Sequence, residues 1–178
     1  MRSPFRRPVP VPDEVRVRAG LRRGEALAAT AAEDGTWVVG TRDALVLLPP
    51  DGPGASIRWE QVETADWDRE EERLRVVEVA HFGDEQPVHT FTLTEPGQLL
   101  PMVRERVSAS VLLQRRVPVR GRRGLSVVAR RAPSGTGPIT WAWEYDAGVD
   151  PEDPEVREAA AAGLRAAQQD VGATGEPI

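Results

Sequence analysis

The chain has 178 residues and contains no cysteine, so disulfide bonds, thiolate catalysis and cysteine-ligated metal sites are excluded. A lack of cysteine is typical of proteins in a reducing cytoplasm. No apolar run approaches the roughly 20 residues that a membrane-spanning helix needs. The first residues, MRSPFRRPVPVPDEV, contain arginines but no apolar segment behind them, which argues against a secretory signal. We therefore expect a soluble, cytoplasmic protein.

Lysine is absent as well, and all 23 basic residues are arginine. Alanine, glycine and proline are abundant, a composition that favours a GC-rich bacterial genome as the source. The charges are segregated along the chain, although the net charge is only −5. Arginines outnumber acids by seven to two in residues 1–24 and by nine to one in residues 104–143. Acids outnumber arginines by 16 to five in residues 25–103 and by nine to two in residues 144–178. The acidic total argues against general nucleic-acid binding.

The sequence also lacks any recognisable catalytic motif. It has no nucleophile elbow of the hydrolases, no glycine-rich phosphate loop, no zinc-protease helix and no dinucleotide-binding fingerprint. Pairs of acids are too plentiful to single out one for general acid–base catalysis. We therefore predict a protein that is not an enzyme and that needs no cofactor or metal ion. Its length suits one domain, or a small domain with an appended subdomain.

Short apolar runs separated by turn residues begin near residue 25 and predict an antiparallel meander. The runs are ALAATAA, TWVVGT and LVLL, separated by EDG and RDA and followed by PPDGPG. Asp34-Gly35 is a strong signal for a hairpin turn. Upstream, proline alternates with arginine and valine, so residues 1–20 are predicted to form a tail or a strap along the surface.

The stretch WEQVETADWDREEERLRVVEV begins at Trp59 and holds two tryptophans, a run of acids and several valines. Ile57 and Trp59 share one strand face, and a bulge or helical turn at Glu60-Gln61 explains why Val62 falls out of phase. The segment DREEE is predicted to be a polar turn into a return strand, and PVHTFTL adds a further strand. The tryptophans are therefore predicted to be core anchors and not a ligand site.

Two amphipathic helices are predicted, with a β-hairpin between them. The first helix runs from about residue 97 to about residue 115, with Pro101 in its first turn. The hairpin consists of RGLSVVARR and PITWAWEYD. The second helix lies in DPEDPEVREAAAAGLRAAQQDVG, with Asp153 as the N-cap, Pro154 in the first helical position and Gly172 beyond the end.

The order of elements in residues 20–115 resembles the bacterial pleckstrin-homology-like (GRAM-like) barrel, in which short meander strands, a kinked strand such as IRWEQV and further strands precede an amphipathic helix. The resemblance implies an α+β fold: a partly open antiparallel β-barrel with a capping helix, extended here by a β-hairpin and a C-terminal helix. The basic loop expected early in a membrane-binding barrel of this kind is missing, because the meander is acidic.

The C-terminal part resembles an uncharacterised family of small actinobacterial proteins through VRERVSASVLLQRRVPVRGRRGLSVVARR, ITWAWEYD and DPEDPEVREAAA. This resemblance implies a fold and no reaction. We divide the chain into a Pro/Arg-rich N-terminal tail (residues 1–20), the barrel and its helix (21–116), the β-hairpin with the C-terminal helix packed on it (117–172), and a tail (173–178).

The acids between Asp66 and Glu72 are one candidate metal site. An EF-hand calcium loop that started at Asp66 would need glycine and glutamate where the chain has Glu71 and Val77. We therefore favour a solvated turn.

The two histidines are another candidate metal site. His81 and His89 are predicted to flank a turn, with Asp84 or Glu85 within reach as a third ligand. Their spacing matches no metal-binding motif, so surface histidines without a metal are the favoured interpretation.

Arginines around the junction between the first helix and the hairpin are the best candidate site for an anion such as nucleic acid, a nucleotide or an acidic lipid. Guanidinium groups bind phosphates and carboxylates in bidentate fashion, and two tryptophans lie on the partner strand. We favour the alternative that these arginines pair with acids of the same molecule. The cluster comprises Arg115, Arg116, Arg120, Arg122, Arg123, Arg130 and Arg131.

Two apolar stripes complete the candidates. The stripe Ile139, Trp141, Trp143 and Tyr145 is predicted to belong to the core. The narrow stripe of the second helix is predicted to pack closely on a flat surface, either its own sheet or a protein partner, and consists of Val156, Ala160, Leu164 and Ala167. The protein is therefore expected to be a non-catalytic binding or scaffold protein that acts through a partner or self-association, with anion binding as the alternative.

Overall fold

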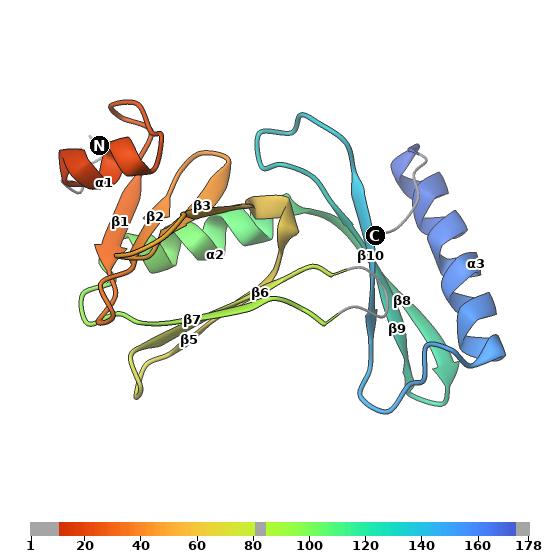
Figure 1. Ribbon diagram of the computed structural model, residues 1–178. Helices are drawn as coiled ribbons and strands as arrows, with labels where there is room; N and C mark the ends of the chain where they lie inside the picture. Colours follow the sequence, from red (N-terminus) through yellow and green to blue (C-terminus); the bar gives the residue numbers. More distant parts are fainter. Residues whose placement is uncertain (1–10, 81–84, 174–178) are drawn as a thin grey trace, which may run out of the picture.

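The computed structural model describes residues 11–80 and 85–173, which form an α+β fold of three small antiparallel sheets and three α-helices. In Figure 1 the first two sheets lie around helix α2, and the third sheet lies beside them with helix α3 against it. The strands within these ranges do not close into a barrel. None of the helices in the same ranges is both long and apolar enough to cross a membrane.

The first sheet contains the predicted meander in the order β1 (Ala28–Ala31), β2 (Trp37–Gly40), β3 (Ala44–Leu48) and β4 (Ala55–Arg58). The turn between β1 and β2 forms as predicted, because Gly35 adopts a φ of +83° and the Asp34 carboxylate accepts the N–H of Thr36 at 2.9 Å. Every residue of β3 is buried, so this strand is covered on both faces.

A short helix, α1 (Asp13–Arg18), lies where the sequence predicted an extended strap, and the prediction is wrong for these residues. Val15 of this helix is buried against apolar side chains of β2 and β3. Pro12 stands immediately before the helix, where its missing N–H costs no helical hydrogen bond. The other part of the predicted tail, residues 1–10, lies outside the described residues.

The second sheet follows a short 3₁₀ turn, Trp59–Gln61, and contains β5 (Val62–Asp68), β6 (Arg73–Glu78) and β7 (Val88–Thr92). The turn and a register shift at Glu63 confirm the predicted break in the strand pattern. Trp59 is fully buried, and its indole N–H donates to the backbone oxygen of Thr41 at 3.1 Å. Trp59 is therefore a core anchor, as predicted.

Helix α2 (Leu99–Ser110) packs on the apolar side of the first two sheets and completes their shared core. Pro101 lies in its first turn, as predicted. The helix ends five residues before the predicted end at Arg115, and Val111 begins a strand directly. The prediction is wrong there because VLLQRRVPVR alternates apolar and polar residues with a period of two, which suits a strand better than a helix.

The third sheet has the order β10-β9-β8, formed by β8 (Val111–Arg120), β9 (Arg123–Arg130) and β10 (Thr140–Tyr145). The predicted hairpin is the pair β9–β10, and β8 is a third strand that the sequence prediction missed. Helix α3 (Pro154–Val171) follows, as predicted. Asp153 caps it by accepting the N–H of Glu155, and Gly172 ends it with a φ of +67°.

Helix α3 packs on β8 and β9 through its narrow apolar stripe. A side chain at Gly163 would place its Cβ 2.5 Å from a methyl group of Val117, so the helix lies close to the sheet here and any larger residue would require Val117 to shift. The candidate partner-binding residues Val156, Ala160 and Ala167 are buried, and Leu164 packs beside them. The stripe therefore packs on its own sheet and is not open to a partner.

Candidate functional site

Most of the arginine cluster pairs with acids of the same chain. Arg115 contacts Asp170 of helix α3, and Arg116 contacts Asp146 after β10. Arg120 binds Asp153 at 2.7 Å and Glu155 at 3.2 Å at the start of α3. These pairs join strand β8 to the acidic C-terminal segment, as the segregated charges suggested.

Two of the other members lie beside these surface pairs, because Arg116 donates to the backbone oxygen of Arg122 at 2.9 Å and the charge of Arg123 helps to lower the pKa of Asp146. Arg130 is buried, with 4% of its side chain exposed, and lies 3.6 Å from Glu144. Arg131 reaches the backbone oxygen of Gly135 at 3.5 Å. Arg122 and Arg123 are exposed at the β8–β9 turn and have no ion-pair partner among the described residues. The cluster is therefore not one continuous cationic surface.

The pair formed by Arg116 and Asp146 predicts a specific pH dependence. The hydrogen bond from Arg116, followed by the backbone N–H of Gly124, lowers the pKa of the Asp146 carboxyl from 3.8 to about 2. Because the pKa is lowered in the folded chain, the stabilisation is present above pH 3.8 and is lost as the pH falls toward about 2. We expect the Asp146 carboxyl to titrate near pH 2 by NMR and its pKa to rise toward 3.8 in the Arg116→Gln variant. A pKa that stays unchanged in the variant would contradict the pairing.

The described residues contain no group of three potential metal ligands, and the acidic segment from Asp66 to Glu72 is among them. His89 lies 2.6 Å from the Glu78 carboxylate, while His81 and Asp84 lie outside the described residues. In the acidic turn, the Asp68 carboxylate accepts the N–H groups of Glu70 and Glu71. These carboxylate contacts stabilise the turn itself.

The aromatic stripe of β10 is partly core and partly pocket wall. Trp141 is fully buried, and Ile139 packs against the same core cluster. Trp143 and Tyr145 line a hollow of about 550 Å³ between β10 and the first turns of α3. Trp143 and Tyr145 also pack against this core cluster, so all four residues of the stripe contribute to the core, as predicted.

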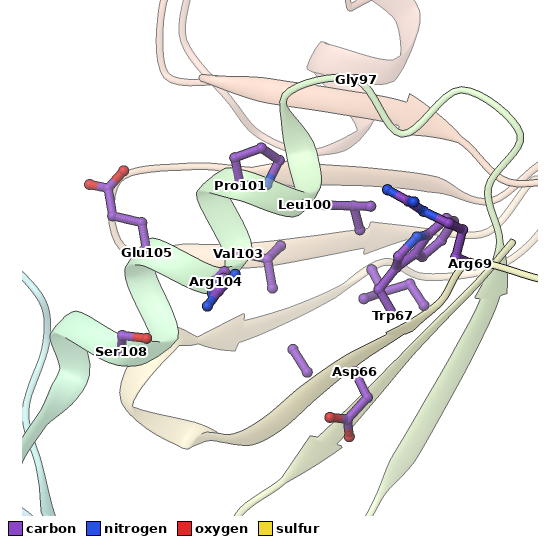
Figure 2. A pocket seen from close by; sticks show the side chains of 12 residues that line it. Asp66, Trp67, Arg69, Gly97, Leu100, Pro101, Val103, Arg104, Glu105 and Ser108 are labelled. Atoms are coloured by element: carbon purple, nitrogen blue, oxygen red, sulfur yellow. The ribbon is translucent and has the colours of Figure 1, made fainter.

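A groove of about 920 Å³ lies between β5 and α2. Figure 2 shows Trp67 and Arg69 projecting from the β5 side toward Leu100 on the helix, with Arg104 farther along the helix. We call it the β5–α2 groove. It is lined by Ala65, Asp66, Trp67, Arg69, Leu74, Gly97, Leu100, Pro101, Val103, Arg104, Glu105 and Ser108.

The floor of the β5–α2 groove is apolar and its rim is charged. Trp67 and Leu100 are half-buried and pack against the core beneath. Arg69 and Arg104 are exposed, and neither guanidinium group has an ion pair or hydrogen bond to another described residue. An apolar floor beside unpaired cations is suited to bind a ligand that carries both apolar and acidic groups.

Strand β5 is an edge of its sheet, because β6 is the only described strand that pairs with it in the order β5-β6-β7. The N–H of Val79 binds the oxygen of Gln61, and the N–H of Leu93 binds the oxygen of Glu72. These bonds lie at the ends of the β5–β6 and β6–β7 ladders. Because hydrogen-bonded and non-hydrogen-bonded pairs alternate along an antiparallel ladder, the bonds show which β5 residues point their backbone groups away from β6. Together with the pairing of β5 and β6, they assign this orientation to Ala65, opposite Val76, and to Trp67, opposite Leu74. The backbone N–H and C=O groups of Ala65 and Trp67 therefore point away from β6, along the edge of the sheet, and both residues also line the β5–α2 groove.

One end of this free edge is closed by the third sheet. The guanidinium group of Arg130 donates to the backbone oxygen of Glu63 at 3.0 Å and to the hydroxyl of Ser110 at 3.4 Å. Burial is the main cause that raises the pKa of the Glu63 carboxyl, and nearby Glu144 adds to it. Burial likewise lowers the pKa of Arg130. The free edge thus begins after Glu63.

Sequence reasoning missed the β5–α2 groove. It assigned Trp67 to the core and did not connect Arg69 or Arg104 to any site. The signal in the sequence was weak, because a strand pattern does not reveal whether the strand lies at a sheet edge. The alternation in VETADWD did place Ala65 and Trp67 on one face, which is the face that contacts α2.

No family model matches the chain, and comparisons with curated proteins and with solved structures give no significant match.

Proposed function

We propose that this protein is a non-catalytic, cytoplasmic binding protein whose protein partner docks in the β5–α2 groove. The observation that carries the proposal is the groove itself, where an apolar floor and two arginines that pair with no other described residue lie beside the edge strand β5. Exposed edge strands are regular sites of pairing with another chain unless they are covered. The absence of cysteine supports the choice of a reducing compartment.

The chemistry of the lining supports binding more than catalysis. Asp66 and Glu105 are both exposed to solvent, so neither lies in the water-excluded setting that tunes a catalytic carboxylate. Ser108 is the lining residue with a hydroxyl group, and none of the lining residues is a histidine that would activate it.

We further propose that residues 21–116 have a pleckstrin-homology-like architecture. A four-stranded sheet, a three-stranded sheet and a helix against their shared core occur in the order expected for such a domain. Anion binding by the arginine cluster is the less favoured alternative, because Arg115, Arg116, Arg120 and Arg130 pair with internal acids.

The test is partner capture with the Leu100→Glu variant beside the wild-type chain. Leu100 lies in the groove, so a carboxylate at this position is expected to reduce recovery of a genuine partner at least 10-fold. The matched control is Leu112→Glu, at a leucine that is 43% exposed on β8 and outside the groove lining. The measurement is quantitative mass spectrometry of proteins retained from a lysate of the source bacterium.

A partner that is retained equally by wild type and Leu100→Glu, but is lost with Leu112→Glu, would contradict the proposed groove. Circular dichroism of both variants checks that each retains the fold.

A further inference from the structure

We propose that the partner supplies an extended peptide segment, which adds to the second sheet as a strand beside β5. Two side chains of the added strand face α2. One is apolar and contacts Trp67 and Leu100, and the other carries a carboxylate that contacts Arg104. This inference rests on the proposed function and names the chemistry of the partner.

Backbone geometry provides the first support. The N–H and C=O groups of Ala65 and Trp67 point away from β6 at the sheet edge, so β5 offers two donors and two acceptors at the spacing of an antiparallel or parallel ladder. Addition of a strand to such an edge supplies hydrogen bonds from the main chain, and pockets for alternate side chains supply specificity. The groove contains such pockets at Trp67 and Leu100.

The spacing across the groove provides the second support. Leu100 and Arg104 are four residues apart on α2, a rise of about 6 Å along the helix axis. Alternate side chains of a strand are about 6.6 Å apart. Two inward-facing side chains of one added strand can therefore contact Leu100 and Arg104 in turn, and the expected peptide motif is an apolar residue two positions from Asp or Glu.

The charge of β5 argues against a second copy of the same chain as the occupant. A β5–β5 pair would bring Asp66 and Asp68 of one copy beside the same residues of the other, on the exposed face of the strand. Like charges on neighbouring strands destabilise the pairing. A peptide with basic or neutral residues at its outward positions avoids this repulsion.

The free edge also sets the length of the added strand. Arg130 occupies the oxygen of Glu63 at one end, and β5 ends at Asp68 at the other. The five residues 64–68 span about 16 Å at the rise of a strand. A peptide core of about five residues is therefore sufficient.

The experiment uses a phage-displayed library of random 12-residue peptides, selected on the full-length chain. Dissociation constants of the selected peptides are then measured by fluorescence polarisation with two proline variants. Ala65→Pro removes an N–H that points away from β6 on the edge strand β5, whereas Thr90→Pro removes one that points away from β6 on the opposite edge strand, β7. Proline is tolerated at such edge positions because no ladder hydrogen bond is lost.

We expect Ala65→Pro to weaken binding at least 10-fold and Thr90→Pro to change it less than 2-fold. N-methylation of the peptide, one residue at a time, should weaken binding with a period of two, because alternate amides of an added strand donate to β5. This scan uses the wild-type chain, so it tests the inference even if Ala65→Pro fails to fold. Uniform effects along the peptide would overturn strand addition.

The predicted contact between a carboxylate of the peptide and Arg104 is tested by reversing the charge of each partner. Arg104→Glu should weaken the acidic peptide at least 5-fold, and exchange of the peptide's Asp or Glu for Lys should restore binding to that variant. Arg23→Glu, at an exposed arginine outside the groove lining, is the control and should have no effect. Failure of the exchanged peptide to recover affinity would overturn the assignment of the carboxylate.

The outcomes separate this inference from the proposed function. If no peptide is selected, or selected peptides ignore Ala65→Pro, strand addition is wrong. The groove would still be the docking site if Leu100→Glu abolishes partner capture. If Leu100→Glu has no effect on capture, the proposed function fails as well.

Discussion

Replacing Arg130 with methionine is expected to lower the free energy of unfolding by about 3–5 kcal/mol, the usual cost of removing one partner from a buried charge pair. Arg130 is 4% exposed and contacts the backbone oxygen of Glu63, the hydroxyl of Ser110 and the carboxylate of Glu144. Without the guanidinium group, the carboxylates of Glu63 and Glu144 lose the cation that lies near both of them, and the backbone oxygen of Glu63 loses its hydrogen-bond donor.

The measurement is urea denaturation followed by tryptophan fluorescence. Arg131→Met is the matched control, because Arg131 is more exposed and reaches one backbone oxygen at 3.5 Å, so a loss below about 1 kcal/mol is expected. Equal losses in the two variants would contradict the special role of Arg130.

The pH dependence of the Arg130→Met variant gives an independent check. The pKa of Glu63 is already raised above 4.5 in the folded chain by burial, and Arg130 opposes this rise. Without Arg130 the pKa rises further, so the folded state takes up a proton before the unfolded state does. The loss of stability should therefore shrink as the pH falls from 7 toward 4.5. A loss that grows over this range would contradict the account.

The second large effect is expected at the β8–β9 hairpin. Gly124 lies opposite Pro118 in the ladder, and a Cβ at this position would overlap the backbone oxygen of Val117 and lie 2.9 Å from the Cα of Pro118. Backbone atoms cannot rotate away as a side chain can, so Gly124→Ala is expected to cost about 3 kcal/mol. Its control is Gly121→Ala in the adjacent turn.

At Gly121 a Cβ would meet no atom within 4 Å, although φ is +61°. The expected cost of that substitution is therefore about 1 kcal/mol, from the left-handed backbone alone. Thermal unfolding of both variants measures the difference. If Gly121→Ala proves the more damaging substitution, the close approach of β8 and β9 is not what requires glycine at residue 124.

The sequence predicted correctly those elements that depend on interactions between residues close together in the chain. The hairpin at Asp34-Gly35 and the cap of α3 at Asp153 depend on residues that are adjacent in sequence, and both are confirmed. The end of α2 and strand β8 were mispredicted, because Val111 continues the helical spacing of the preceding residues. Its pairing with Arg130 of β9 decides the outcome, and that contact is distant in sequence.

The same limit applies to the functional site. The face shared by Ala65 and Trp67 followed from the alternation of VETADWD, but the sequence did not show that β5 lies at an edge. Nor did it show that Arg104, on a helix more than thirty residues away, lines the same groove as Trp67. Arginine pairing was predicted more successfully, because opposite blocks of charge in one compact chain tend to neutralise each other.

The junction between α2 and β8 has a mechanical consequence. Helix α2 ends at Ser110 and β8 begins at Val111, so no loop residue lies between them to serve as a hinge. Arg130 and Arg131 fasten the same junction through the side chain and the backbone oxygen of Ser110. The helix and the third sheet are therefore joined without a flexible linker, and we expect a displacement of α2 to be transmitted directly to β8.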